Sequence, residues 1–337
     1  MSVSPKKLSV HFLLYKWNSC PPLVKGGIVF FLLCALLSAL VCWSSKASPS
    51  GNTPPPNFKT IRWEYSTDTI RLAVLGDIGH DKGKGKIRTL ANTLYALHQE
   101  RPLNGGVLLL GDNFAIEKDN TDKLLSIAKV QFEGPFKSLV EEGVSFYAIL
   151  GNHDNDYGLE PFELSYPLFH LQGNYYYTKV FGKGLVEVFF LYSRYLRENP
   201  QNHLLWLDEK LRQSSALWKI ALIHHPIYTT ALGHRSSKTL AKSLEPLFKE
   251  YGVFMVFQGH NHVYEHLEPI QGVHYFTVGS SGKVQKGDLS SKGFKRLGGN
   301  DRTTAFLILD FEKDKCLFTT YDSKGVILDQ GIIPGIK

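Results

Sequence analysis

The chain has 337 residues, and its hydrophobic content of 43% and charged content of 20% are typical of a folded globular protein. Its net charge of +7 does not indicate a nucleic-acid surface, because residues 1–60 hold six lysines and no acidic residue, which leaves the remainder close to neutral. Three of the four cysteines lie in the first 42 residues, so Cys316 alone cannot form a disulfide framework in the rest. We therefore expect neither a nucleic-acid partner nor a disulfide-stapled fold.

An uncharged apolar run occupies residues 26–45, between Lys25 and Lys46. As a helix, a run of this length would span roughly 30 Å, the hydrocarbon thickness of a bilayer. It is longer than the apolar part of a signal peptide, so we expect an uncleaved single-pass anchor; a cleaved signal, giving a secreted protein, is the alternative. Because more lysines precede the run than closely follow it, the folded domain is expected outside the cytoplasm.

The region after the apolar run is rich in serine, proline and asparagine, a composition that favours an extended linker. A folded domain is expected to begin at Ile61. The predicted organisation is therefore a cytoplasmic basic arm, a membrane segment, a linker and one large domain, at residues 1–25, 26–45, 46–60 and 61–337.

Five short apolar runs in this domain lack polar alternation, which is typical of central strands covered on both faces. They occupy residues 71–77, 106–113, 145–154, 218–226 and 253–262. Amphipathic stretches at 86–100, 202–213 and 238–252 predict helices, and Gly252 is expected to end the last one. This alternation predicts an α/β layered domain with helices packed on sheet.

Polar residues follow each of the five predicted strands directly. They are Asp77, Asp112, Asn152 with His153, His224 with His225, and His260 with His262. Because ligands of α/β folds bind at the carboxyl ends of strands, these side chains are expected to converge on one site. Carboxylate, amide and imidazole groups suit two iron, zinc or manganese ions held close together by a shared carboxylate.

Taken in chain order, these residues resemble the calcineurin-like metallophosphoesterase superfamily, whose pattern is GD, GD, GNHD or GNHE, H, and GHxH. The matching residues are Gly76-Asp77, Gly111-Asp112, Gly151-Asn152-His153-Asp154, His224 and Gly259-His260-Asn261-His262. GDNF at 111–114 and HHPIY at 224–228 are similar to the tartrate-resistant, purple acid phosphatase branch. The resemblance implies a layered β-sandwich with helices packed on both sides.

The resemblance also implies a set of ligands for two metal ions: Asp77, Asp112 and His262 for the first, and Asp112, Asn152, His224 and His260 for the second. Asp112 would bridge the two ions. His153 would face the substrate as a general acid or phosphate-binding group. A hydroxide formed from metal-bound water would attack phosphorus in line.

Two departures concern the first ion. Purple acid phosphatases place a tyrosine ligand three residues after the bridging aspartate, where this chain has Ala115. Other branches place a histidine two residues after the first aspartate, where this chain has Gly79. We therefore expect no tyrosinate colour and a first ion that is bound more weakly or completed by water; His80 is an alternative donor.

The remaining histidines differ in what their positions indicate. His225 is expected either to contact substrate or to cap the turn before Pro226, and His234 lies in a loop that approaches substrate in related phosphatases. The others are expected to be ordinary surface or helix histidines: His98, His170, His203 and His274.

The predicted function is that of a metal-dependent phosphoric ester hydrolase, most simply a phosphomonoesterase like the acid phosphatases. Its partners would be a phosphorylated small molecule or a phosphoprotein, and the membrane. A phosphodiesterase or diphosphatase using the same metals is one alternative. A degenerate, non-catalytic interaction protein is the other.

Overall fold

A computed structural model describes residues 68–116 and 123–335 of the chain. The helices of this part are η1 (Ile78–Asp81), α3 (Lys86–Glu100), α4 (Leu124–Ala128), η3 (Lys129–Glu133), α5 (Lys137–Glu141), α6 (Asn152–Asp156), α7 (Glu160–Ser165), η4 (Pro167–Phe169), α8 (Ser193–Glu198), α9 (Gln201–Gln213) and α10 (Lys238–Tyr251). The strands are β1 (Ile70–Leu75), β2 (Gly106–Leu109), β3 (Phe146–Ala148), β4 (Tyr177–Phe181), β5 (Val186–Phe190), β6 (Trp218–Ile223), β7 (Val253–Gln258), β8 (Tyr264–Leu267), β9 (His274–Val278), β10 (Arg296–Asn300), β11 (Ala305–Phe311), β12 (Lys315–Asp322) and β13 (Ile327–Pro334).

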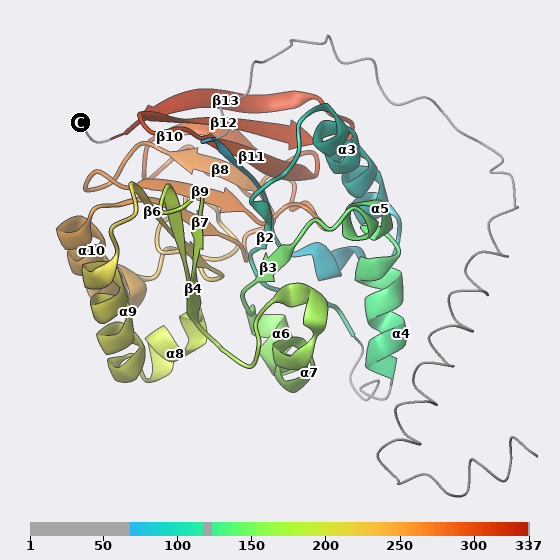
Figure 1. Cartoon of the computed structure of the whole chain (residues 1–337), viewed down its shortest axis with the longest axis horizontal. Helices are drawn as coiled ribbons and strands as arrows, with labels where there is room; N and C mark the ends of the chain where they lie inside the picture. Colours follow the sequence, from blue (N-terminus) through green and yellow to red (C-terminus); the bar gives the residue numbers. More distant parts are fainter. Residues whose placement is uncertain (1–67, 117–122, 336–337) are drawn as a thin grey trace, which may run out of the picture. The chain divides into compact units, whose positions relative to one another are not determined.

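The strands form two sheets (Figure 1). One has six strands in the order β13-β12-β11-β1-β2-β3, and the other has seven in the order β10-β8-β9-β7-β6-β5-β4. The strands at the centre run parallel, with β1, β2 and β3 in the first sheet and β5, β6, β7 and β9 in the second. Antiparallel strands extend both sheets outward, so the carboxyl ends of the parallel strands lie at common edges.

Successive residues of the central strands point to opposite faces and enter different layers of the core. In β1, Leu72 and Val74 join a cluster that also contains residues of the seven-stranded sheet, such as Ile220 and Leu222. The alternate residues, such as Leu75, face the opposite way, into a second cluster that helices cover. The apolar runs of the sequence are thus buried on both faces, as expected for central strands.

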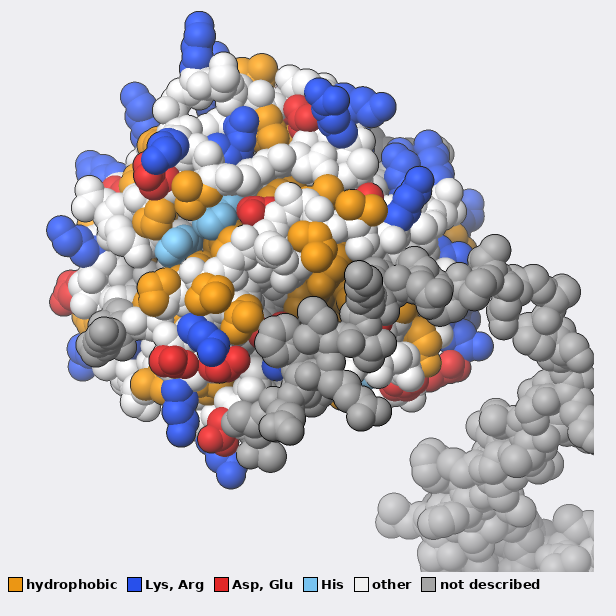
Figure 2. Space-filling view, turned by 90° about the horizontal axis from the view of Figure 1, so that it is seen from above, with side chains coloured by type: hydrophobic (Ala, Val, Ile, Leu, Met, Phe, Trp, Pro, Cys, Tyr) orange, Lys and Arg blue, Asp and Glu red, His pale blue; other side chains and the backbone are white. Residues whose placement is uncertain are grey.

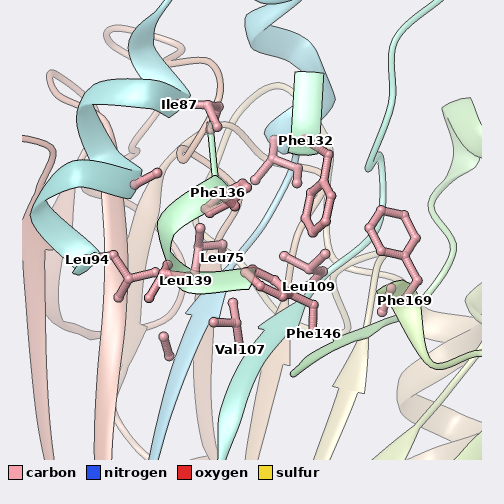
Figure 3. Close-up of a cluster of buried hydrophobic side chains, with 14 of the residues drawn as sticks. Leu75, Ile87, Leu94, Val107, Leu109, Phe132, Phe136, Leu139, Phe146 and Phe169 are labelled. Carbon is pink, nitrogen blue, oxygen red and sulfur yellow. The ribbon is translucent and has the colours of Figure 1, made fainter. Parts of the chain in front are cut away.

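Helices cover the outer face of each sheet. Buried side chains of α3 and α5 pack on the six-stranded sheet together with an aromatic group around Phe132, Phe146 and Phe169 (Figure 3). On the seven-stranded sheet the cover comes from α9 and α10, through residues such as Leu207 and Leu244. Two sheets with helices form a mixed α/β architecture, which agrees with the layered α/β part of the predicted fold class.

The predicted elements compare well with the observed ones at the centre of the domain. All five apolar runs contain a strand, and the three amphipathic stretches match α3, α9 and α10 within one residue at each end. Gly252 ends α10 with φ 68°, a left-handed conformation that favours glycine. The antiparallel strands after residue 262 were not predicted, because their sequences combine short apolar runs with polar and glycine residues.

The expected N-terminal arm, membrane segment and linker, residues 1–60, lie outside the described residues. Among residues 68–116 and 123–335, no helix combines the length and the apolar character needed to cross a bilayer.

On the face shown in Figure 2, Lys and Arg side chains project around the rim, whereas hydrophobic and histidine side chains lie nearer its middle.

One histidine expected to be ordinary is instead deeply buried. His203 in α9 is 1% exposed, its ring stacks on Tyr176 with centroids 4.0 Å apart, and neither ring nitrogen has a hydrogen-bond partner in the described structure. Burial lowers the pKa of His203 to about 3. The folded chain therefore requires a neutral imidazole here.

Replacing this imidazole should change how stability depends on pH. A lowered folded-state pKa means that the unfolded chain binds the extra proton, so His203 costs stability as pH falls from about 6.5 toward about 3, by about 1.4 kcal/mol per pH unit. We expect His203→Phe to gain stability over the wild type as pH falls from 7 to 5 in urea unfolding. A gap between the two proteins that does not change with pH would contradict the assignment.

Candidate metal centre

The polar residues at the five strand ends meet in one place. Asp77 follows β1, Asp112 follows β2, α6 begins with Asn152 and His153 after β3, and the histidines that follow β6 and β7 complete the group. The ring of His224 joins the two sheets, because its Nδ1 lies 2.7 Å from the carbonyl oxygen of Leu110 after β2. The convergence predicted from the sequence is therefore present.

Asp112 lies at the centre of this group and is 2% exposed. One carboxylate oxygen, Oδ1, lies 3.5 Å from Nε2 of His224, and the other, Oδ2, lies 3.3 Å from Nε2 of His80. Nε2 of His153 is 3.9 Å from the same Oδ2. A carboxylate whose two oxygens face different sets of imidazoles has the arrangement required to bridge two ions.

The second carboxylate belongs to Asp77, which is fully buried. Its Oδ2 accepts a hydrogen bond from the backbone N–H of His260, at 3.0 Å. Its Oδ1 lies 3.6 Å from Nε2 of His262 and has no hydrogen-bond partner in the described structure. A buried carboxylate oxygen without a partner is costly unless a cation compensates it.

The backbone at these positions is held in an uncommon conformation. Asp77, Asp112 and His260 have φ values of 58°, 52° and 69°, in the left-handed region that side-chain-bearing residues rarely adopt. Such strain concentrates at functional sites, where the surrounding structure enforces it. Space is equally restricted, because a Cβ on Gly151 would lie 2.1 Å from Oδ1 of Asp112.

Hydrogen bonds orient the imidazoles as ligands. Since Nδ1 of His224 donates to Leu110, its Nε2 is left with a free lone pair directed at the site, 3.0 Å from Oδ1 of Asn152. Burial, followed by repulsion from His224, lowers the pKa of His260, and burial, followed by repulsion from His80, lowers the pKa of His262 to about 3. Neutral imidazoles are the form that binds metal ions.

A second set of buried acids supports Asp112. The carboxylate of Asp154 accepts hydrogen bonds from the backbone N–H groups of Asp112, Asn113 and Gly151, at 2.8, 3.0 and 2.7 Å. Burial, and then repulsion from Asp112, raises the pKa of Asp154 to about 7. Glu163 accepts a hydrogen bond from Nδ2 of Asn113 at 2.8 Å, which further fixes the loop that carries Asp112.

The donor set fits a pair of metal ions. Three groups of potential ligand atoms occur among the described residues, each with its atoms within 4.8 Å of one another: Asp77, His80 and His262; His80, Asp112 and His153; and Asp112, His224 and His260. Burial, and then repulsion from Asp112, raises the pKa of Asp77 well above its usual range, which reflects a buried negative charge without compensation. Two cations at these groups would supply that compensation.

The sequence left open whether His80 is a donor for the first ion. The structure brings it into two of the three donor groups. The sequence signal that could have identified it is its position three residues after Asp77.

Two cavities flank the carboxylates. The larger, about 560 Å³, is lined by residues that include His80, His153, His234 and His262. The smaller, about 490 Å³, lies beside Asn152, His225 and His260. The ring centroids of His234 and His260 are 3.8 Å apart. Nδ1 of His225 forms a hydrogen bond with Oγ of Ser193 at 2.7 Å.

The family profile described as calcineurin-like phosphoesterase matches residues 70–264, which is more than half of the chain and includes all five strand ends. The chain belongs to the calcineurin-like phosphoesterase family. It is a metal-dependent phosphoester hydrolase of this family, whose dinuclear metal site agrees with the donor groups described above.

Curated relatives and solved structures agree with this assignment. The chain is 25% identical to purple acid phosphatase 7 of Arabidopsis thaliana, over 78% of this chain and 85% of the relative. It is also 25% identical to the mouse (Mus musculus) tartrate-resistant acid phosphatase type 5, over 64% of this chain and 73% of the relative. GAP50 of Plasmodium shares the fold with a TM-score of 0.66 at 21% identity, covering 80% of this chain and 90% of that one.

Removing the hydrogen-bonded support of Asp112 should weaken metal binding. In Asp154→Ala three buried N–H groups lose their acceptor, so the loop that carries Asp112 is no longer fixed. We expect metal affinity to fall about 10–100-fold, measured by competition with a chelating dye. Asp156→Ala, an exposed carboxylate of the same short helix, serves as the control. Equal affinities for the two variants would show that Asp154 does not position the site.

Proposed function

We propose that the chain is a phosphomonoesterase in which Asp112 bridges two metal ions. The first ion would be held by Asp77 and His262, and the second by Asn152, His224 and His260. The observation that carries this proposal is the set of three donor groups that share buried carboxylates at the strand ends. Two such ions, when bound, supply a water-derived nucleophile at neutral pH and neutralise charge on the phosphoryl oxygens.

His153 is suited to act on the substrate. Its side chain is 33% exposed and lines the larger cavity, and its ring stacks on Tyr157 with centroids 5.2 Å apart. Its backbone N–H donates to Oδ1 of Asp112 at 2.9 Å, which fixes it beside the bridging carboxylate. From this position the imidazole can donate a proton to the leaving oxygen or a hydrogen bond to the phosphoryl group.

The larger cavity favours an anionic substrate. Lys82, Lys84 and Lys283 line it together with His153 and His234, and the ion pairs of lysines in the described residues involve other lysines. Their charges would attract a phosphate ester into the cavity. We assign His234 a role in contacting the substrate here, and His225 a similar role in the smaller cavity beside Asn152.

A cavity of about 560 Å³ would also admit a diester or a diphosphate, so these substrates are included in the test. A second candidate function is that of a non-catalytic anchor. It is favoured by the similarity in fold to the Plasmodium protein, which is described as the anchor in the inner membrane complex. The buried imidazoles argue for hydrolysis, because an interaction surface has no physical need for them.

The test of the proposal is hydrolysis by the full chain. The chain would be treated with chelator, reloaded with Mn²⁺, Zn²⁺, Fe²⁺ or Mg²⁺, and assayed with p-nitrophenyl phosphate and its bis-ester. We expect metal-restored turnover of the monoester, which Asp112→Asn lowers by more than about 100-fold. Asp314→Asn, an exposed aspartate remote from the site in the sequence, should retain activity.

Preference for the bis-ester would replace the monoesterase assignment with that of a diesterase. Absence of turnover on either substrate, in a folded and metal-loaded wild type, would favour the non-catalytic anchor. Equal activity of Asp112→Asn and the wild type would refute the role of the bridging carboxylate.

We also propose that residues 26–45 anchor the chain in a membrane with its catalytic domain outside the cytoplasm. The support is the uncharged run itself and the lysines that precede it. After alkaline carbonate washing of cell membranes, we expect the full chain in the pellet and a chain lacking residues 1–45 in the supernatant. If the full-length gene instead yields a supernatant chain that lacks its N-terminal segment, the run is a cleaved signal.

A further inference from the structure

The turn after β1 brings Asp77 and His80 to the same side of the chain. Residues Ile78–Asp81 form the 3₁₀ helix η1, and Asp77 is its N-cap. A ligand atom of the His80 ring lies within 4.8 Å of a carboxylate oxygen of Asp77.

The backbone contacts of Gly79 explain why the donor is at position 80 and not at position 79, where other branches of the family place a histidine. Its N–H donates to the carbonyl oxygen of Asp112 at 3.0 Å, which fixes η1 against the bridging residue. A Cβ on Gly79 would lie 2.5 Å from the backbone of Phe114, so a side chain at position 79 does not fit. His80 is the next residue of the turn and has the space to reach the site.

The far end of the turn is fixed as well. The carboxylate of Asp81 accepts hydrogen bonds from the backbone N–H groups of Gly85, Lys86 and Ile87, at 3.0, 3.2 and 3.3 Å, where α3 begins. The position of the His80 backbone is thereby determined from both sides. An imidazole held this way loses little conformational freedom when it binds a ligand.

The His80 imidazole faces the bridging carboxylate. Its side chain is 15% exposed, and its Nε2 lies 3.3 Å from Oδ2 of Asp112. Its ring centroid is 4.5 Å from that of His262 and 4.9 Å from that of His153. One ligand atom of His80 lies within 4.8 Å of ligand atoms of both Asp77 and His262.

We propose that His80 is a protein ligand of the first metal ion, completing a set with Asp77, His262 and the bridging Asp112. This inference rests on the proposed assignment of the two ions. Ala115 lines the same cavity as His80 but offers no donor atom. His80 thus supplies, from a different point of the chain, the donor that the purple acid phosphatases place at the position of Ala115.

The exchange of a phenolate for an imidazole changes which ions the site prefers. Imidazole suits divalent zinc, iron, nickel and copper, and it carries no negative charge to favour a trivalent ion. Both ions would then have two side chains with carboxylate or amide oxygens and two imidazoles. The structure therefore assigns the chain a pair of divalent ions, without the tyrosinate-to-iron colour.

Metal stoichiometry tests His80 without relying on activity. The full chain, His80→Ala and His98→Ala, a histidine in α3 outside the donor groups, would be loaded with Zn²⁺ and desalted, and metal content would be measured by mass spectrometry. We expect two ions per chain for the wild type and His98→Ala. His80→Ala should keep one ion and bind the other more than about 10-fold more weakly.

His80→Gln, which retains a neutral donor, should bind the first ion with intermediate affinity and serves if His80→Ala does not fold. Wild-type metal affinity in both His80 variants would overturn the proposal, even if the KM for ester hydrolysis changed. A purple iron-loaded wild type would also overturn it. Two bound zinc ions in a wild type that hydrolyses no ester would refute the proposed function and leave the role of His80 intact.

Discussion

The structure of the site depends on one constraint, the negative charge of Asp112 buried between two sheets. A carboxylate removed from water is strongly destabilising unless cations or hydrogen-bond donors compensate it. Burial alone would raise the pKa of Asp112, but His224, His80 and His153 around it hold that pKa below its usual range. Asp77 and Asp154 add further buried carboxylates, and two metal ions are the compensation that this group of acids requires.

The two sheets are arranged so that their strand ends bring the donor atoms for these ions together. The carboxyl ends of β1, β2 and β3 meet those of β6 and β7, and each end contributes donor atoms from a loop of few residues. The left-handed conformations of Asp77, Asp112 and His260 are the cost of directing side chains inward from such short loops. Helix packing on the outer faces of the sheets keeps these strand ends in register.

Similarity to the purple acid phosphatases covers most of the chain, yet the donors that we propose for the first metal ion differ. The position of the tyrosine ligand is occupied by Ala115, and His80 approaches the same site from the turn after β1. A metal site specifies the kinds of donor atoms and their positions, whereas the chain segment that presents them is free to change. The close contact between Gly79 and Phe114 decides which residue of the turn can do so.

The sequence by itself determined the central strands, three of the helices and the convergence of their polar ends, because burial on both faces and glycine-flanked polar clusters leave local patterns. It also favoured the metal ligands through a resemblance carried by those same clusters. Only the tertiary structure decided the pairing of β1 with β11, which lie far apart in the chain, and the burial of His203 against Tyr176. The approach of His80 to Asp112 likewise depends on a contact between residues 79 and 114, which no local pattern encodes.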